Sequence, residues 1–412
     1  MSMLSDGVST GVGRLPAHVV AAGTGKGRPT YVYDLAALRA RCAEISALPL
    51  PRKRVYFASM ANDHPQVIGC VRDAGHGVFV NSRSHLQTAL NAGVPPDRVL
   101  YASSNMVDEE MRHCADLGVR VVLDSVAQVG RFGVVAGPGH EIGLRVSVGF
   151  IDGATLRDDP GYRFGVRPDE LPAAVAAARE HGLLIAGVHS YFGTNLPAAP
   201  LIDGIERLAE AAATLPDIAF LDAGGGFGVA MPDKPEFDFD TYTRGVRAHL
   251  ERLERRVGRA VEFVLEPGRY LAANCGHFFV TVVDVKERAD RVFVGTNASV
   301  AVFPRPLMYP DRAEHPCGIV GRDPLDPPDE RPVYVCGSST YSQDFLARGI
   351  RLPLPQIGDT LVFGHAGAYC RSMVTRFLGK DAPLEVILDG PSSAVSATAE
   401  VDLLAKTAVT TS

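Results

Sequence analysis

Short apolar runs alternate with amphipathic segments along residues 55–265. Near-continuous apolar runs are typical of strands buried on both faces, and apolar residues at helical spacing lie between these runs. The predicted strands are Val55–Ala58, Gly77–Val80, Val99–Ala102, Val119–Leu123, Ile142–Val146, Leu184–His189, Ala219–Asp222 and Phe263–Leu265. Helices are predicted near residues 65–74, 83–92, 107–117, 126–136, 167–181, 201–214 and 240–256. This alternation predicts a parallel (β/α)8 barrel of the TIM type, with a doubly wound open sheet as the alternative.

The pattern changes after Arg269, where strand-like runs are separated by loops rich in proline and glycine. These runs are Phe278–Val285, Arg291–Gly295, Val333–Val335, Thr360–Phe363 and Leu384–Leu388. With little helical periodicity between them, they predict a second, all-β domain, either a β-sandwich or a β-barrel. We therefore expect three parts: a leader at 1–28 that contributes to the β domain, the barrel at 29–272, and the β domain at 273–412.

Composition narrows the class of protein. The 412 residues are 46% hydrophobic and 21% charged, as in an ordinary globular enzyme, and the net charge of −6 comes without a basic block. We therefore expect no nucleic-acid partner. No run is long enough to span a membrane, and no signal segment is evident, so a cytoplasmic location is expected. The seven cysteines are scattered without a CxxC pair, which indicates reduced thiols and no metal site.

Chemistry-bearing residues follow three of the predicted strands. Polar residues at the carboxyl ends of barrel strands face the side where such barrels carry their active sites. The first strand runs into Tyr56–Asn62, with Met60 near its end. The seventh is followed by Gly224–Gly226, where backbone N–H groups can approach an anion, although a lone glycine run is more often a turn. The eighth leads into Glu266-Pro-Gly-Arg269, where a Glu–Arg ion pair is the simpler interpretation.

Together these segments resemble the fold-type III pyridoxal-phosphate (PLP) decarboxylases, the ornithine and diaminopimelate decarboxylase family with an alanine racemase-like barrel. In that family a lysine at the end of the first strand holds PLP as a Schiff base, and Met60 stands at the lysine position. The resemblance implies that PLP is the cofactor. The implied cofactor-binding residues are Tyr191, which stands where a histidine stacks on the ring, Thr194, Gly224, Gly225 and Gly226 for the phosphate, Glu266 for the ring nitrogen, Gly268, Arg269 and the bordering Tyr369.

The resemblance also implies a ligand site and a homodimer. Arg305 and Tyr309 match an Arg-Pro-x-x-Tyr segment that holds the substrate carboxylate, a role suited to a planar guanidinium. Residues 337–344 match a loop donated across a dimer interface, in which Asp344 is retained. In that loop Thr340 replaces the proton-donating cysteine, and Tyr341 replaces the acid that reads a distal ammonium.

Other family positions have also changed. Phe79 replaces an aspartate and His85 stands where an active-site glutamate is usual. An engineered change at Met60 would leave its neighbours intact, so natural divergence is favoured. No other lysine is an obvious substitute for the anchor. Three functions remain open. The first is a decarboxylase-like protein of a specialised biosynthetic pathway that binds PLP noncovalently. The others are an inactive ligand-binding or regulatory paralogue and a repurposed enzyme that needs no internal aldimine.

Overall fold

The computed structural model describes residues 7–10, 13–152, 155–159, 161–231, 234–310, 315–323, 326–390 and 396–398. The chain divides into two compact units. The barrel unit is Arg39–Leu271, and the β unit combines Met1–Leu38 with Ala272–Ser412. Within the described residues, no helix is both long and apolar enough to cross a membrane.

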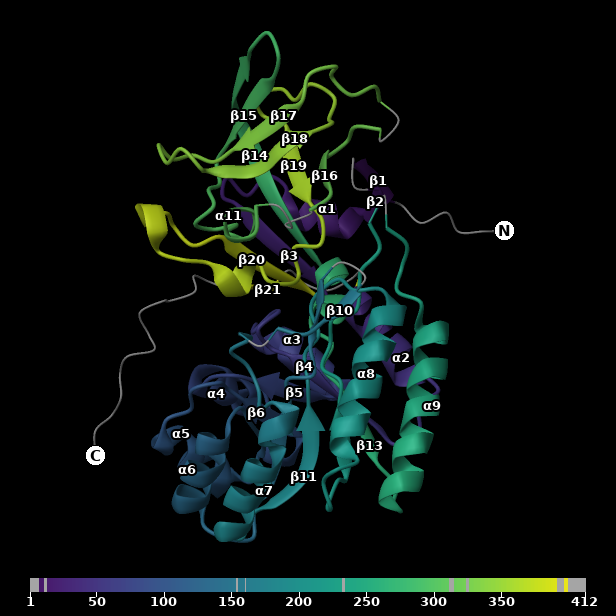
Figure 1. The fold of residues 1–412 in the computed structure, drawn as a ribbon. Coiled ribbons are helices and arrows are strands. Elements are labelled where there is room, and N and C mark those ends of the chain that lie inside the picture. Colours follow the sequence, from purple (N-terminus) through teal and green to yellow (C-terminus); the bar gives the residue numbers. More distant parts are fainter. Residues whose placement is uncertain are drawn as a thin grey trace, which may run out of the picture. The chain divides into compact units, whose positions relative to one another are not determined.

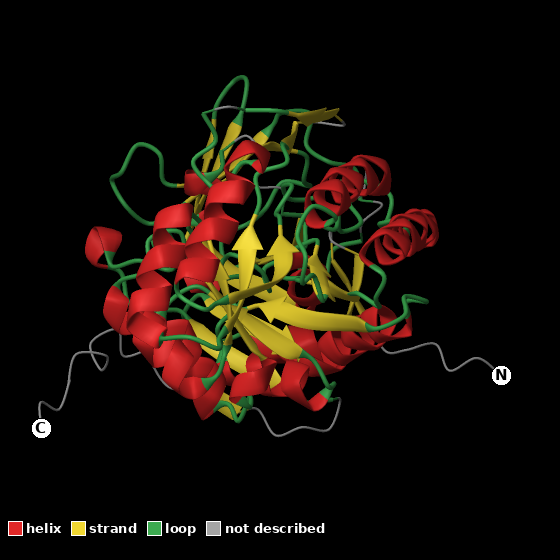
Figure 2. Ribbon diagram, turned by 60° about the horizontal axis from the view of Figure 1, so that its bottom comes forward, coloured by secondary structure: helices red, strands yellow, loops and turns green. Residues whose placement is uncertain are grey.

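The barrel unit contains a closed barrel of parallel strands, and β13 pairs with β4 to close it. Its strands are β4 (Lys53–Ala58), β5 (Gly77–Val80), β6 (Val99–Ala102), β7 (Arg120–Leu123), β8 (Glu141–Arg145), β11 (Leu184–His189), β12 (Phe220–Asp222) and β13 (Glu262–Leu265). Each predicted barrel strand is present, and the closed barrel is confirmed over the open sheet. Figure 2 shows these strands inside a layer of helices.

The helices alternate with the strands as predicted. They are α2 (Leu35–Ala47), α3 (Pro65–Asp73), α4 (Arg83–Asn91), α5 (Asp108–Leu117), α6 (Val126–Ala136), α7 (Leu171–Glu180), α8 (Ala198–Ala212) and α9 (Phe239–Val257). Serine caps begin two of them, because the side chains of Ser82 and Ser125 accept hydrogen bonds from backbone amides in the first turns of α4 and α6. A short hairpin, β9 (Phe150–Asp152) with β10 (Thr155–Arg157), was not predicted.

Large and small residues alternate inside the barrel. The Phe220 ring fills the interior beside Gly187 and Gly143, where an added Cβ would lie 2.3 Å and 2.9 Å from that ring. The Arg120 guanidinium carbon lies 4.5 Å from the centre of the same ring. The two glycines are therefore required by the close approach of Phe220, and the barrel is a packed core rather than a pore.

The β unit is built on a sheet of order β18-β17-β15-β14-β3-β20-β21, and β19 joins β16 to β14. The strands are β3 (Thr30–Asp34), β14 (Gly276–Glu287), β15 (Val292–Thr296), β16 (Cys317–Ile319), β17 (Val333–Cys336), β18 (Phe345–Ile350), β19 (Thr360–Phe363), β20 (Leu384–Leu388) and β21 (Ser396–Thr398). In the leader, β1 (Gly7–Thr10) pairs with β2 (Gly13–Pro16), and α1 (Ala17–Gly23) follows.

Strand β3 lies in the β unit rather than in the barrel, which corrects the predicted boundary at residue 28. Figure 1 shows β3 between β14 and β20. It pairs antiparallel with β14 and parallel with β20. Its first four residues are buried, and the Tyr31 hydroxyl donates a 2.8 Å hydrogen bond to the Val302 carbonyl. A short apolar run shows that a strand exists but not which sheet it joins, so the sequence pattern could not assign it.

Candidate active site

The glycine loop after β12 is shaped by three close backbone approaches. Gly224 and Gly226 have φ of +63° and +96°, a region that favours glycine. A Cβ at Gly225 would lie 2.4 Å from the Glu266 carbonyl oxygen. The Gly224 amide donates to an Asp222 carboxylate oxygen at 2.9 Å, and the Glu266 amide donates to the Gly224 carbonyl at 2.7 Å. Side chains are thus excluded, which leaves a backbone cradle for an anion.

Three buried titratable side chains lie below this loop, at the carboxyl ends of neighbouring strands. His189 ends β11, Asp222 ends β12 and Glu266 follows β13. One ligand-type atom from each lies within 4.8 Å of those of the other two. His189 Nε2 is 3.4 Å from Glu266 Oε2. Glu266 Oε1 has no hydrogen-bond partner in the described part of the chain, so a buried acceptor or acid remains available to a ligand.

Burial controls the protonation of this cluster. It raises the pKa of Glu266 to about 7, although Asp222 and Arg145 act in the opposite direction. Burial and the neighbouring Glu266 charge raise the pKa of Asp222 well above its usual value. Burial lowers the pKa of His189 to about 4. At neutral pH the histidine is therefore neutral, and the two carboxyl groups share less than their full negative charge.

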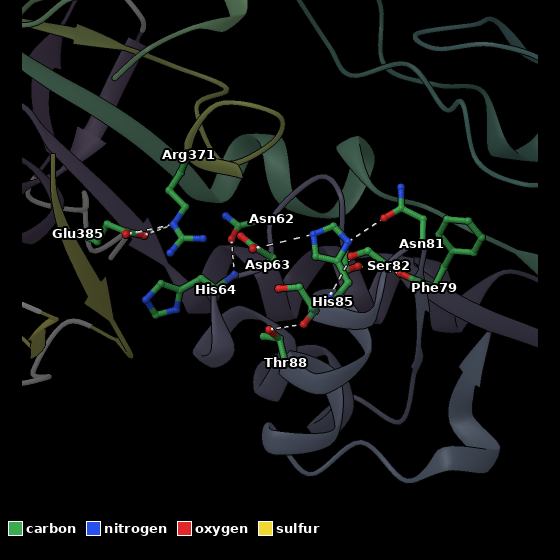
Figure 3. A network of polar contacts seen from close by, with 12 residues as sticks. Asn62, Asp63, His64, Phe79, Asn81, Ser82, His85, Thr88, Arg371 and Glu385 are labelled. Atoms are coloured by element: carbon green, nitrogen blue, oxygen red, sulfur yellow. Dashed lines mark hydrogen bonds and ion pairs between the residues drawn. The ribbon is translucent and has the colours of Figure 1, made fainter. Parts of the chain in front are cut away.

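Met60 follows the carboxyl end of β4, and His85 lies in the first turn of α4, the helix that follows β5. Met60 is partly buried and packs against the apolar barrel interior. The Ser59 hydroxyl donates to the Phe79 carbonyl at 2.8 Å, which links the two strand ends. His85 Nδ1 lies 2.9 Å from Asn81 Oδ1, and its Nε2 lies 3.9 Å from Asp63 Oδ2 (Figure 3). The structure thus places the His85 imidazole in the first turn of α4, between Asn81 and Asp63.

Several other predicted cofactor residues lie near the glycine loop. Tyr191 is 37% exposed, and its Cα is 3.5 Å from where a Cβ on Gly224 would lie. Arg269 begins the short helix α10 (Arg269–Ala272) directly after Gly268, and its Nε donates to the Thr194 hydroxyl at 3.5 Å. The structure thus brings the glycine loop together with the partly exposed Tyr191, the Thr194 hydroxyl and the Arg269 guanidinium.

In the β unit, Arg305 begins the short helix α11 (Arg305–Met308) and is buried. Its guanidinium carbon lies 5.0 Å from the centre of the Tyr309 ring and 5.9 Å from that of Tyr369. Tyr369 has a φ of +56°, which is uncommon for a bulky residue and marks a constrained turn. The structure therefore groups two predicted site residues, Tyr309 and Tyr369, around the buried Arg305 cation.

The loop between β17 and β18 carries Thr340, Tyr341 and Asp344. The Asp344 carboxylate accepts hydrogen bonds from the backbone amides of Val300, at 2.7 Å, and Ser339, at 3.0 Å. A Cβ at Gly337 would lie 2.1 Å from Asp344 Oδ1. Asp344 therefore braces its own loop. Thr340 is exposed, and the Tyr341 ring packs edge-on against Phe377 with 5.3 Å between the ring centres.

Comparison with known proteins decides the family. Residues 35–273 match the sequence model of the pyridoxal-dependent decarboxylases, pyridoxal binding domain. The chain belongs to this family. It is 31% identical over 379 residues to the diaminopimelate decarboxylase of Methanothermobacter thermautotrophicus, covering 88% of this chain and 87% of that protein. It is 27% identical to the diaminopimelate decarboxylase of Escherichia coli K12, with 91% and 90% covered.

Solved structures support the same fold. A diaminopimelate decarboxylase structure superposes with a TM-score of 0.79 at 25% identity, covering 89% of this chain and 90% of that one. The Helicobacter pylori enzyme complexed with L-lysine gives a TM-score of 0.79 at 22% identity, covering 90% and 93%. The family establishes PLP as the cofactor and an amino-acid decarboxylase-like character.

The residues of this chain fit PLP. The glycine cradle suits the phosphate, because a side chain at Gly225 would strike the backbone. The unpartnered Glu266 Oε1 suits a ring nitrogen. The sequence motifs indicated both contacts, but they did not indicate that His189 and Asp222 form one buried cluster with Glu266. Their only signal was a polar residue at the carboxyl end of an apolar strand.

Proposed function

We propose that the protein is a decarboxylase-like member of the family that binds PLP noncovalently, together with an amino-acid-like carboxylate. One combination carries the proposal. The glycine cradle and the buried Glu266 are present, while the residue at the anchor position, Met60, has no amine. A methionine can pack against a ring but cannot form a covalent linkage to an aldehyde.

When bound, PLP supplies an electron sink that stabilises the negative charge left by loss of carbon dioxide. The residues of this chain would bind and orient it. Gly224–Gly226 hold the phosphate through backbone N–H groups, and Glu266 holds a proton at the ring nitrogen. Tyr191 presents an aromatic face, and Met60 packs beside it where the lysine would otherwise stand.

The ligand class follows from the β unit. Arg305 can pair with a carboxylate through two parallel N–H groups, and Tyr309 lies against its guanidinium. Tyr341 has no charge with which to read a distal ammonium. We therefore propose a ligand with an α-carboxylate but without a distal amine recognised by the 337–344 loop. This differs from the L-lysine and putrescine named in the structures of relatives.

Borohydride reduction tests the noncovalent model. We expect purified protein to bind PLP and to show no PLP fixed to any lysine after reduction, whereas Met60→Lys should become labelled at residue 60. The exposed Val134 provides a control, because Val134→Lys should acquire no label. Labelling of the native protein at a lysine would contradict the proposal, and so would a Met60→Lys protein that binds PLP but remains unlabelled.

A second candidate is a catalytically inactive PLP-binding paralogue. It is favoured by the joint replacement of the anchor lysine by Met60 and of the proton-donating cysteine by Thr340. Release of carbon dioxide from a panel of amino acids separates the two functions. Turnover by the native PLP-loaded protein supports the enzyme, and turnover by Met60→Lys alone supports the paralogue.

A further inference from the structure

The amino-terminal end of the barrel contains a polar cavity. It has a volume of about 340 Å3, at the lower end of the range for small-molecule sites. It lies where β4 begins, whereas Met60 follows the end of that strand, so the cavity is distinct from the glycine loop. Its lining includes Lys53, Arg54, Arg98 and the buried Tyr56.

The cavity carries an excess of positive charge. Lys53, Arg54 and Arg98 contribute three cations, and Glu262 is the carboxylate among its lining residues. Glu262 is already engaged, since it accepts hydrogen bonds from Arg54 and Arg120 at 2.8 Å each. Burial lowers the pKa of His76, another lining residue, so it adds no charge at neutral pH.

Tyr56, one of the residues that line the cavity, carries a buried hydroxyl donor. Its side chain is fully buried, and its hydroxyl has no hydrogen-bond partner in the described ranges of the chain. Such groups are rare in folded proteins because each costs about 1–3 kcal/mol. Burial raises the pKa of Tyr56 to about 12, so the phenol stays protonated and can donate. Gly77 makes room for the ring, since a Cβ there would lie 2.6 Å from it.

The cations of this cavity are not explained by a need to neutralise the negative carboxyl end of a nearby helix. The carboxyl end of α3 lies beside the cavity, and helix ends attract positive charge. However, its last carbonyls already accept hydrogen bonds from the amides of Ala74, Gly75 and His76. Lys53 donates one hydrogen bond to the Leu48 carbonyl at 2.6 Å, which leaves its other N–H groups for a ligand.

We propose that this cavity binds a small oxyanion of the phosphate or carboxylate class, held by Lys53, Arg98 and the Tyr56 hydroxyl. The guanidinium and the ammonium provide charge-assisted donors, and the phenol satisfies its own buried group by donating to the anion. The site is independent of the function proposed above, because it uses no residue of the glycine loop.

Calorimetric titration of the full chain with inorganic phosphate at constant ionic strength tests the proposal. Because phosphate also fits the glycine loop, each titration of native protein and of the cavity variants uses PLP-saturated protein. A parallel titration uses PLP-free Gly225→Ala, in which the new side chain blocks that loop. We expect Arg98→Ala and Lys53→Gln each to weaken binding at least tenfold, and Tyr56→Phe to weaken it without loss of the folded state. Arg83→Ala, which removes a surface pair with Glu109, should leave binding unchanged.

The same titration with citrate shows whether the site prefers phosphate or a polycarboxylate. The proposal is supported if either anion binds and its binding is weakened by the three cavity variants but not by Arg83→Ala. Phosphate binding that is equal in native protein and in Arg98→Ala would overturn it. So would binding that only Gly225→Ala abolishes, because the anion would then occupy the glycine loop. Absence of binding of both anions to the native protein would also refute it.

Discussion

His189 Nε2 lies 3.4 Å from Glu266 Oε2, and both side chains are almost completely buried in the barrel. Each is unfavourable in its charged form, so their pKa values move in opposite directions: that of Glu266 rises to about 7 and that of His189 falls to about 4. At neutral pH the Glu266 carboxyl group can therefore accept a proton from a bound ring nitrogen or share one with it, while His189 stays neutral.

The raised pKa of Glu266 predicts a specific pH dependence of stability in PLP-free protein. Between its ordinary value of 4.5 and about 7, the folded state binds the proton more tightly than the unfolded state. This proton therefore contributes about 3 kcal/mol to the free energy of unfolding. The contribution is complete below pH 4.5 and is lost as the pH rises through 7. Denaturant unfolding should therefore show that the free energy of unfolding of the native protein falls relative to that of Glu266→Gln as the pH rises.

His189 provides the opposing control. Its lowered pKa means that the unfolded state binds a proton first, so its contribution to stability grows as pH rises from about 4 to 6.5. His189→Asn should remove this rise, so the pH slopes of the two variants should deviate from the native slope with opposite signs. Parallel slopes in all three proteins would contradict the assigned pKa shifts.

Gly225→Ala should abolish tight PLP binding. The new Cβ would lie 2.4 Å from the Glu266 carbonyl, so the loop must move, at a cost of ~1–3 kcal/mol. Gly69→Ala is the matched control, because this helical glycine has open space around its Cβ position and should gain ~0.5–1 kcal/mol. PLP titration followed by absorbance measures the first effect and thermal unfolding the second. Unchanged PLP affinity in Gly225→Ala would refute the role of the loop.

Arg305→Ala should weaken binding of a carboxylate ligand by about 1.5–3 kcal/mol, because it removes a charge-assisted contact. Arg305→Lys keeps the charge but loses the planar fork and its packing against Tyr309 and Tyr369, so it should recover only part of the affinity. Calorimetry with the ligand identified by the carbon dioxide panel measures both. Full affinity in Arg305→Ala would show that the carboxylate binds elsewhere.

The protein should form a homodimer. Phe377 is 49% exposed and packs against Tyr341 in the loop that completes the partner's site in the family. Aromatic side chains are enriched at protein interfaces, and Phe377 presents an exposed ring there. Sedimentation at micromolar concentration should show a dimer, and Phe377→Asp should shift it toward monomer. A monomeric native protein would contradict this prediction, and Val134→Asp is a surface control on α6.

The sequence pattern predicted the barrel well because its strands and helices have clear apolar periods. It missed β16 and β18, which are short runs interrupted by Gly318 and Gly349. The glycine loop and Glu266 were found through motifs. The clustering of His189 with Asp222 was not, because burial of a polar residue depends on side chains from neighbouring strands that periodicity does not report.

The position of β3 has a consequence for the order in which the chain can fold during synthesis. Thr30 pairs with Leu384 in β20 and Phe279 in β14, so this strand leaves the ribosome long before either partner exists. All the barrel strands are made in the meantime and pair within residues 53–265. The barrel can therefore form first, while an apolar strand waits unpaired at its amino-terminal side. Such an edge is a site for aggregation or chaperone capture until translation reaches the last strands.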